Sequence, residues 1–143
     1  MKAVVFHQHG ALENIRLEDI PAPKPAPGEC LVRVRAVSLN GFDPMILRGI
    51  PGLRTPMPMI PGADVAGEIV ELGSEVDARW KVGDRVAVIP NRKPSGMMGE
   101  TLRGGACELI AISPEWLLPM PDKVTYVQAA CLPTAYGAAI RMM

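Results

Sequence analysis

Prolines and glycines divide the first 120 residues into short segments, and this division limits what the chain can fold into. The 143 residues include 15 prolines and 14 glycines. Pro21, Pro23, Pro25 and Pro27 remove four amide donors within seven residues, so this segment cannot lie inside a sheet. It predicts an extended surface connection that ends at Gly28. The runs between such breaks are too short for long helices and favour a mainly β fold.

Alternating apolar and polar residues predict the strands themselves. In residues 30–38, Val32, Val34 and Ala36 fall on one face and two arginines on the other, as in a strand with one wet side. We expect the first two strands to pair as a hairpin around residues 8–10, and residues 91–105 to form a long loop. Similar runs predict further strands at 1–6, 15–20, 65–72, 85–89, 106–112 and 116–120.

A short helix is predicted at residues 41–48. Pro44 is tolerated in a first helical turn, and Gly49 provides a stop. Asn40 therefore lies at a junction between a strand and a helix, where side chains and backbone amides can face an open cleft. Asn40 and Asp43 are candidate site residues for this reason. In the alternative interpretation, Asn40 closes a turn and Asp43 caps the helix.

The last 19 residues have a helical character. Thr125 and Gln128 are spaced as in a capping box, which predicts a helix through Ala130. Pro133 interrupts it, and Thr134 is expected to cap a second helix that runs toward the C-terminus. Apolar residues on this segment predict self-association of the chain. They are Leu132, Ala135, Ile140 and Met142.

Composition argues against several classes of partner. Fifteen basic and 15 acidic residues give a formal net charge of zero, so we expect neither nucleic acid nor membrane partners. No apolar run approaches the roughly 20 residues that cross a bilayer, and the N-terminus lacks a signal peptide pattern, so a cytoplasmic location is expected. Cys30, Cys107 and Cys131 are few and widely spaced, which predicts buried free thiols.

One motif carries a family resemblance. Residues 60–73 read Ile-Pro-Gly-Ala-Asp-Val-Ala-Gly-Glu-Ile-Val-Glu-Leu-Gly, and Gly-Asp-Arg-Val follows at 83–86. This pattern resembles the Gly-His-Glu segment of medium-chain dehydrogenases and reductases, the zinc alcohol dehydrogenase and quinone reductase superfamily. Residues 27–34 and 129–139 resemble the same family in the same order. The resemblance covers nearly the whole chain.

The resemblance implies a fold and a domain organisation. It implies a GroES-like fold, a distorted and partly open β-barrel with short helices, as the N-terminal catalytic domain at residues 1–124. Residues 125–143 would then be a helical connector toward a Rossmann domain, which this sequence does not contain. That missing domain would carry most of the nucleotide-binding residues.

The family's zinc site does not carry over to this sequence. The positions of the three catalytic zinc ligands are occupied by Asn40, Ala63 and Ala130. Cys131 misses the third position by one residue, which on a helix is a rotation of about 100°. Without thiolate, imidazole or carboxylate at these places, no tetrahedral zinc site is expected. Residues 91–105 also lack the cysteines of a structural zinc lobe.

The resemblance therefore implies the zinc-independent quinone oxidoreductase branch. Such a protein transfers hydride from NADP or NAD in reduced form to a quinone, an enone or another carbonyl substrate. Asn40 and Asp43 would be catalytic, and Asn40 and Thr134 would contact the cofactor. Tyr136 is a candidate proton donor, with packing against a further domain as its alternative role. The expected partners are the cofactor, a small-molecule substrate and further copies of the chain in a homo-oligomer.

Two other functions stay open at this point. The barrel alone can serve as a binding or assembly module, as GroES-like barrels do in co-chaperonins. A zinc-dependent alcohol dehydrogenase with relocated ligands is the other alternative. In the leading interpretation the isolated chain is inactive, because hydride transfer depends on a bound and oriented cofactor.

Overall fold

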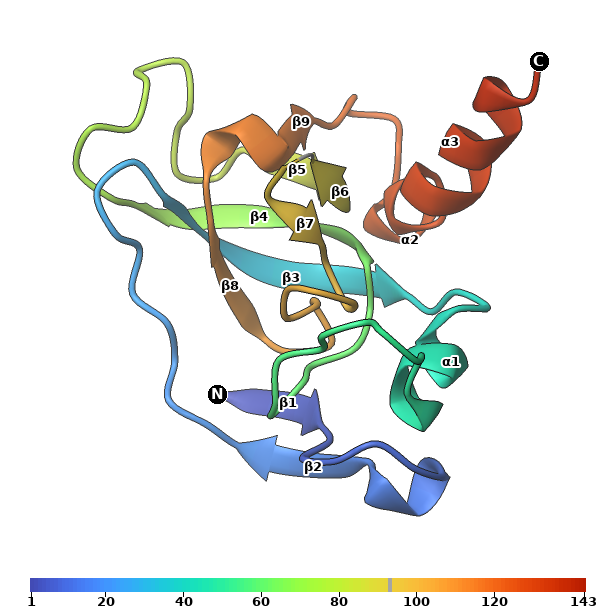
Figure 1. The fold of residues 1–143 in the computed structure, drawn as a ribbon. Coiled ribbons are helices and arrows are strands. Elements are labelled where there is room, and N and C mark those ends of the chain that lie inside the picture. Colours follow the sequence, from blue (N-terminus) through green and yellow to red (C-terminus); the bar gives the residue numbers. More distant parts are fainter. Residues whose placement is uncertain (93) are drawn as a thin grey trace.

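The computed structural model describes residues 1–92 and 94–143 (Figure 1). Its centre is an antiparallel five-stranded sheet with the order β8-β3-β4-β5-β9. A hairpin of β1 and β2 and a small hairpin of β6 and β7 complete a partly open β-barrel. This arrangement confirms the mainly β fold. The strands are β1 (Lys2–Val5), β2 (Arg16–Asp19), β3 (Cys30–Ser38), β4 (Asp64–Leu72), β5 (Arg85–Val88), β6 (Asn91–Arg92), β7 (Gly96–Met97), β8 (Leu109–Ile112) and β9 (Leu117–Pro119).

The long pair of β3 and β4 fixes the geometry of the barrel. The two strands run antiparallel from Cys30 opposite Leu72 to Ser38 opposite Asp64, with two register shifts along the way. The strands also approach closely at Gly67, where an added Cβ atom would lie 2.3 Å from the carbonyl oxygen of Arg33. Only a residue without a side chain fits there. The register brings Asp64 to the end of the sheet, where the chain leaves for α1 (Asp43–Arg48).

Hydrophobic burial holds the sheet together. Apolar side chains from all five strands meet inside the barrel, and both tryptophans are buried in the same cluster. Such burial contributes about 25 cal/mol for each Å² of apolar surface. A smaller cluster packs α1 against the N-terminal segment through Phe6, Ile46, Leu47 and Met59. The main cluster consists of Cys30, Val32, Val65, Ile69, Trp80, Val86, Val88, Met98, Ile110, Ile112, Trp116 and Leu117.

The two C-terminal helices differ in how they pack. Thr125 and Gln128 form the predicted capping box at the start of α2 (Tyr126–Ala130), which packs against β3, β4 and β5. Ala129 and Ala130 are buried there. By contrast, α3 (Pro133–Arg141) buries none of its residues. Among the described residues, no helix has the length and apolar character that crossing a bilayer requires.

Several local predictions were wrong for identifiable reasons. The predicted loop at 91–105 contains the hairpin of β6 and β7, whose two-residue strands are too short to show a period in the sequence. Strands β1 and β2 pair as a hairpin, as predicted, but their connection extends beyond residues 8–10 and includes a short 3-10 helix at Leu12–Asn14. The alternation in residues 15–20 predicted a half-buried strand, but β2 is mostly exposed, since β1 is its only partner in that two-stranded sheet.

The cysteines only partly follow the prediction. All three are free, as predicted, but Cys30 is buried, Cys107 is half-buried and Cys131 is exposed. Cys131 holds the C-cap position of α2 and is exposed, whereas Ala129 and Ala130 before it are buried.

Candidate functional site

A buried carboxylate lies at the centre of the candidate site. Asp64 begins β4 and is only 1 % exposed. Its Oδ1 accepts a hydrogen bond of 2.7 Å from the Thr134 hydroxyl, and its Oδ2 accepts one of 3.2 Å from the Asn40 side-chain amide. The Thr134 backbone N–H lies 3.2 Å from both oxygens, and the Ser38 hydroxyl lies 3.5 Å from Oδ2. These donors satisfy a charge that would otherwise be costly to bury.

The strand register explains why these residues meet. Ser38 ends β3 directly opposite Asp64, and Asn40 follows two residues later, where the chain turns toward α1. Thr134 arrives from a distant part of the sequence, because α2 packs against the same end of the sheet and α3 begins immediately after it. The site therefore joins the barrel to the first turn of α3.

A second buried carboxylate supports the first. Asp43 is 7 % exposed, and its Oδ2 accepts a 2.6 Å hydrogen bond from the backbone N–H of Asn40. Its Oδ1 accepts a 3.0 Å bond from the backbone N–H of Gly62, which has a positive φ of 91°. Asp43 thus fixes the turn before β4. It does not cap α1, because Phe42 holds the N-cap position and makes no side-chain cap bond.

The three predicted site residues converge here. Asn40 contacts both carboxylates, through its backbone to Asp43 and through its side chain to Asp64. Thr134 contacts Asp64. The prediction that Thr134 caps the second helix was wrong: α3 begins at Pro133, and Thr134 lies inside its first turn. Asp64 was not singled out as a site residue from the sequence; an acidic residue within an otherwise apolar strand start was the signal for its central position.

The residues at the family's zinc positions do not fit a zinc ion. Ala63 and Ala130 present methyl groups and are fully buried. The nearby carboxylate of Asp64 is already engaged by hydroxyl, amide and backbone donors. Within residues 1–92 and 94–143, no group of three or more His, Cys, Asp or Glu side chains is placed to hold a metal ion.

An apolar groove lies beside the site. It has a volume of about 720 Å³ and runs between α3 and the segments around β5 and β9. Thr134 and Tyr136 line it from α3, and Asn91 lines it from β6. Tyr136 is 59 % exposed, so its hydroxyl is accessible to a ligand or a neighbouring domain.

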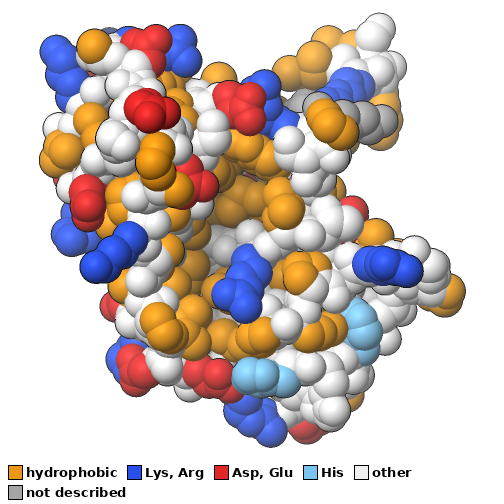
Figure 2. All heavy atoms as spheres, turned by 60° about the vertical axis from the view of Figure 1, so that its left-hand side comes forward, with side chains coloured by type: hydrophobic (Ala, Val, Ile, Leu, Met, Phe, Trp, Pro, Cys, Tyr) orange, Lys and Arg blue, Asp and Glu red, His pale blue; other side chains and the backbone are white. Residues whose placement is uncertain are grey.

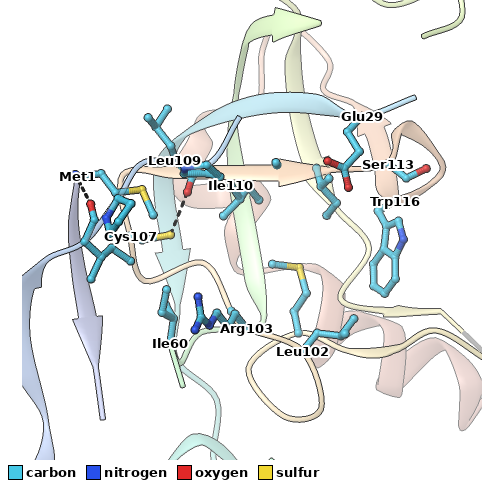
Figure 3. A pocket seen from close by; sticks show the side chains of 17 residues that line it. Met1, Glu29, Ile60, Leu102, Arg103, Cys107, Leu109, Ile110, Ser113 and Trp116 are labelled. Carbon is cyan, nitrogen blue, oxygen red and sulfur yellow. Dashed lines mark hydrogen bonds between the residues drawn. The ribbon is translucent and has the colours of Figure 1, made fainter. Parts of the chain in front are cut away.

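A second hollow lies elsewhere on the barrel. Figure 2 shows one face of the molecule hollowed and lined by hydrophobic side chains. A cavity of about 450 Å³ is lined by Ile60, Arg103, Cys107, Ile110 and Trp116, among others (Figure 3). Burial raises the pKa of the Cys107 thiol to about 11, so the thiol stays protonated at neutral pH. Asn40, Asp43, Asp64 and Thr134 do not line this cavity, and we place the candidate site at Asp64 instead.

Comparison with known proteins defines the class. Residues 26–122 match the alcohol dehydrogenase GroES-like domain, and the chain belongs to this family. It is a member of the medium-chain dehydrogenase and reductase superfamily, as the motif at 60–73 predicted. The partly open barrel confirms the predicted GroES-like fold.

Curated relatives include quinone oxidoreductases. The chain is 32 % identical to the chloroplastic quinone-oxidoreductase QR1 of Triphysaria versicolor over 94 % of its own length and 39 % of the relative. It is 35 % identical to the synaptic vesicle membrane protein VAT-1 homolog of Rattus norvegicus, over 100 % of the chain and 33 % of the relative. The chain thus spans less than two fifths of the length of these two relatives.

Solved structures show the same relationship. An NAD-dependent alcohol dehydrogenase superposes with a TM-score of 0.92 at 27 % identity, over 99 % of this chain and 46 % of that one. The quinone oxidoreductase from Coxiella burnetii gives a TM-score of 0.85 at 32 % identity, over 99 % of this chain and 43 % of that one.

Proposed function

We propose that this chain is the catalytic domain of an NAD(P)H-dependent oxidoreductase that transfers hydride to a quinone, an enone or another carbonyl without catalytic zinc. The observation that carries the proposal is the convergence of Asn40, Asp43 and Thr134 on the buried end of β4 beside an apolar groove. The names of the relatives, quinone oxidoreductase and NAD-dependent alcohol dehydrogenase, support the reaction class.

In this proposal, two half-buried residues, Asn40 and Thr134, contact the ligand. Asn40 and Thr134 reach the surface and orient the bound nicotinamide, which supplies the hydride when present. Both carboxylate oxygens of Asp43 are taken by backbone amides, so we assign Asp43 a positioning role in place of the predicted catalytic one. Tyr136 remains the candidate proton donor because its side chain is exposed on the groove.

Zinc independence rests on the residue types at the site. Alanine methyl groups at 63 and 130 cannot coordinate a metal. A conjugated quinone or enone already delocalises the charge that develops during hydride addition, so the reaction class does not require a Lewis acid. The cytoplasmic location and the homo-oligomer remain predictions. Exposed apolar side chains on α3, such as Ile140, support the prediction of a homo-oligomer.

The direct test uses the complete protein encoded by the source gene. We expect oxidation of NADPH or NADH with a naphthoquinone or an enone, unchanged after treatment with phenanthroline and after addition of zinc. Activity that disappears with the chelator and returns with zinc would contradict zinc independence. Absence of turnover with every quinone, enone and carbonyl tested, while the protein is folded, would contradict the proposed reaction.

Matched variants connect the activity to the site. Asn40→Ala and Thr134→Ala should raise the KM for the nicotinamide nucleotide by about tenfold, as expected for the loss of one hydrogen bond to a bound ligand. Glu68→Gln is the control, because Glu68 lies on the same strand but pairs with Arg35 at the surface. An equal change in all three variants would remove the support for this site.

A further inference from the structure

We infer that Asp64 sets the hydrogen-bonding polarity of the site. The side chains that donate to Asp64 present acceptors to a ligand, so the site binds a ligand group that donates hydrogen bonds. The identity of the ligand rests on the proposed function, but the polarity does not. All five contacts to the Asp64 carboxylate come from N–H or O–H groups. An ionised carboxylate has only acceptor positions, so it fixes the direction of every one of these bonds.

The consequence for Thr134 follows from counting hydrogens. A threonine hydroxyl has one hydrogen and two lone pairs. Thr134 gives its hydrogen to Asp64 at 2.7 Å, which leaves only lone pairs for any other partner. Thr134 lines the apolar groove, so a ligand bound there lies beside this residue.

Asp64 also orients Asn40, although the Asn40 amide nitrogen carries two hydrogens and gives only one of them to this carboxylate. A side-chain amide has a donor nitrogen and an acceptor oxygen on opposite sides of the group. The nitrogen of Asn40 points to Asp64 at 3.2 Å, so the oxygen points away from that carboxylate. The backbone of Asn40 is held by Asp43, which limits its freedom to turn. Within the part of the chain that the structure describes, neither the Asn40 side-chain oxygen nor the Thr134 hydroxyl oxygen accepts a hydrogen bond.

Two acceptors, one of them on Thr134, which lines the apolar groove, select a specific ligand chemistry. They fit a hydroxyl or a primary carboxamide, and they disfavour a carboxylate or another acceptor. In the proposed cofactor these donors are the carboxamide of the nicotinamide ring and the hydroxyls of its ribose. The same polarity excludes the Thr134 hydroxyl as a donor that stabilises negative charge developing on a substrate oxygen, whereas Asn40 keeps a second amide hydrogen besides the one it gives to Asp64.

The first experiment compares cofactor analogues on the complete protein. One analogue carries an acetyl group in place of the carboxamide, and the other lacks the 2′-hydroxyl of the nicotinamide ribose. We expect the wild type and the Glu68→Gln control to bind one of these analogues at least about fivefold more weakly than NAD(P)H. The analogue that loses affinity identifies the source of the donor. Equal affinity for both analogues and the parent cofactor overturns the inference.

Variants at the site test the role of Asp64 itself. In Asp64→Asn, the new side-chain amide can donate, so the amide of Asn40 is free to reverse and the loss of affinity for the analogue should fall below about twofold. Thr134→Val removes one acceptor, so its loss of affinity for the analogue should also fall below about twofold. Thr134→Ser retains the hydroxyl and should show the same loss of affinity as the wild type. If Asp64→Asn fails to fold, the comparison of Thr134→Val with Thr134→Ser still tests the inference. Unchanged discrimination in Thr134→Val and in any folded Asp64→Asn protein overturns the inference.

A measurement without cofactor separates this inference from the proposed function. In the 143-residue chain, NMR reports the solvent exchange of the two side-chain amide hydrogens of Asn40. We expect one of them to exchange at least about fivefold more slowly than in an exposed asparagine, and Glu68→Gln to preserve this difference. A wild-type chain in which both hydrogens exchange freely overturns the polarity. A complete protein that binds no nicotinamide nucleotide, with the slow hydrogen present, refutes the proposed function alone.

Discussion

The five-stranded sheet and α3 are held in place by different forces. The sheet buries Val32, Val65 and Ile69 completely, whereas α3 has no buried residue and leaves Ile140 68 % exposed. The sheet is therefore stabilised by apolar surface removed from water. The contacts that tie α3 to the barrel concentrate at its first turn, where Thr134 meets Asp64. Burial fixes the shape of the barrel, and a few polar contacts fix the direction of the helix.

The first turn of α3 shows how one carboxylate can fix the direction of this helix. The first amides of a helix have no partner within the helix and need an external acceptor. Leu132 occupies the N-cap position and has no side-chain oxygen to provide one. Asp64, 70 residues earlier in the sequence, accepts from the Thr134 amide instead. A residue of the barrel thus replaces the local cap, which couples the orientation of α3 to the site.

The largest expected contrast compares one isoleucine from each region. Ile69→Ala should destabilise the chain by about 3 kcal/mol, because it leaves a cavity in the barrel core. Ile140→Ala on α3 should change the free energy of unfolding by less than about 0.5 kcal/mol. Urea unfolding followed by circular dichroism measures both. Similar losses in the two variants would contradict the distinction between the regions.

A smaller effect is expected from the polar support of the site. Asp43→Ala leaves the backbone amides of Asn40 and Gly62 without their acceptors and should cost about 2 kcal/mol of folding stability. Asp19→Ala removes an exposed carboxylate paired with Lys2 and serves as the control, with an effect below about 0.5 kcal/mol. If the two aspartates prove equivalent in urea unfolding, Asp43 has no structural role at the site.

The capping box of α2 sharpens the comparison further, since α2 links the two regions. Thr125→Ala removes the side chain that accepts from the Gln128 amide and should cost about 1 kcal/mol, while Thr125→Ser should be nearly neutral. Thermal unfolding of the two variants gives the difference. A loss in Thr125→Ser as large as in Thr125→Ala would show that the hydroxyl is not what matters.

Alkylation of the three cysteines probes how deeply each thiol is buried in the folded protein. At pH 8 an alkylating reagent should modify the exposed Cys131 first. Cys107 should react slowly, because burial raises its pKa to about 11 and the reactive thiolate forms only as the pH rises toward that value. Buried Cys30, whose pKa is also raised by burial, should resist modification. Mass spectrometry gives the order, and modification of Cys107 as fast as Cys131 at pH 8 would contradict it.

Local patterns in the sequence predicted much of this fold. The alternation in residues 30–38, the prolines at 21–27 and the Thr125 capping box each depend on neighbouring residues, and each prediction is confirmed. Asn40 was a candidate from its position at a strand-to-helix junction, Thr134 was added through the family resemblance, and the structure brings the two together. The central position of Asp64 was missed because it depends on a contact across 70 residues, which no local period records.

The measurement that tests the polar anchoring of α3 most directly is the hydrogen exchange rate of the Thr134 backbone amide. We predict that Asp64→Ala accelerates this exchange at least about tenfold, while the Ile69 amide, bonded to Asp84 in the barrel, stays protected. A Thr134 amide that exchanges equally fast in the wild type and in Asp64→Ala, with Ile69 protected in both, would contradict the account.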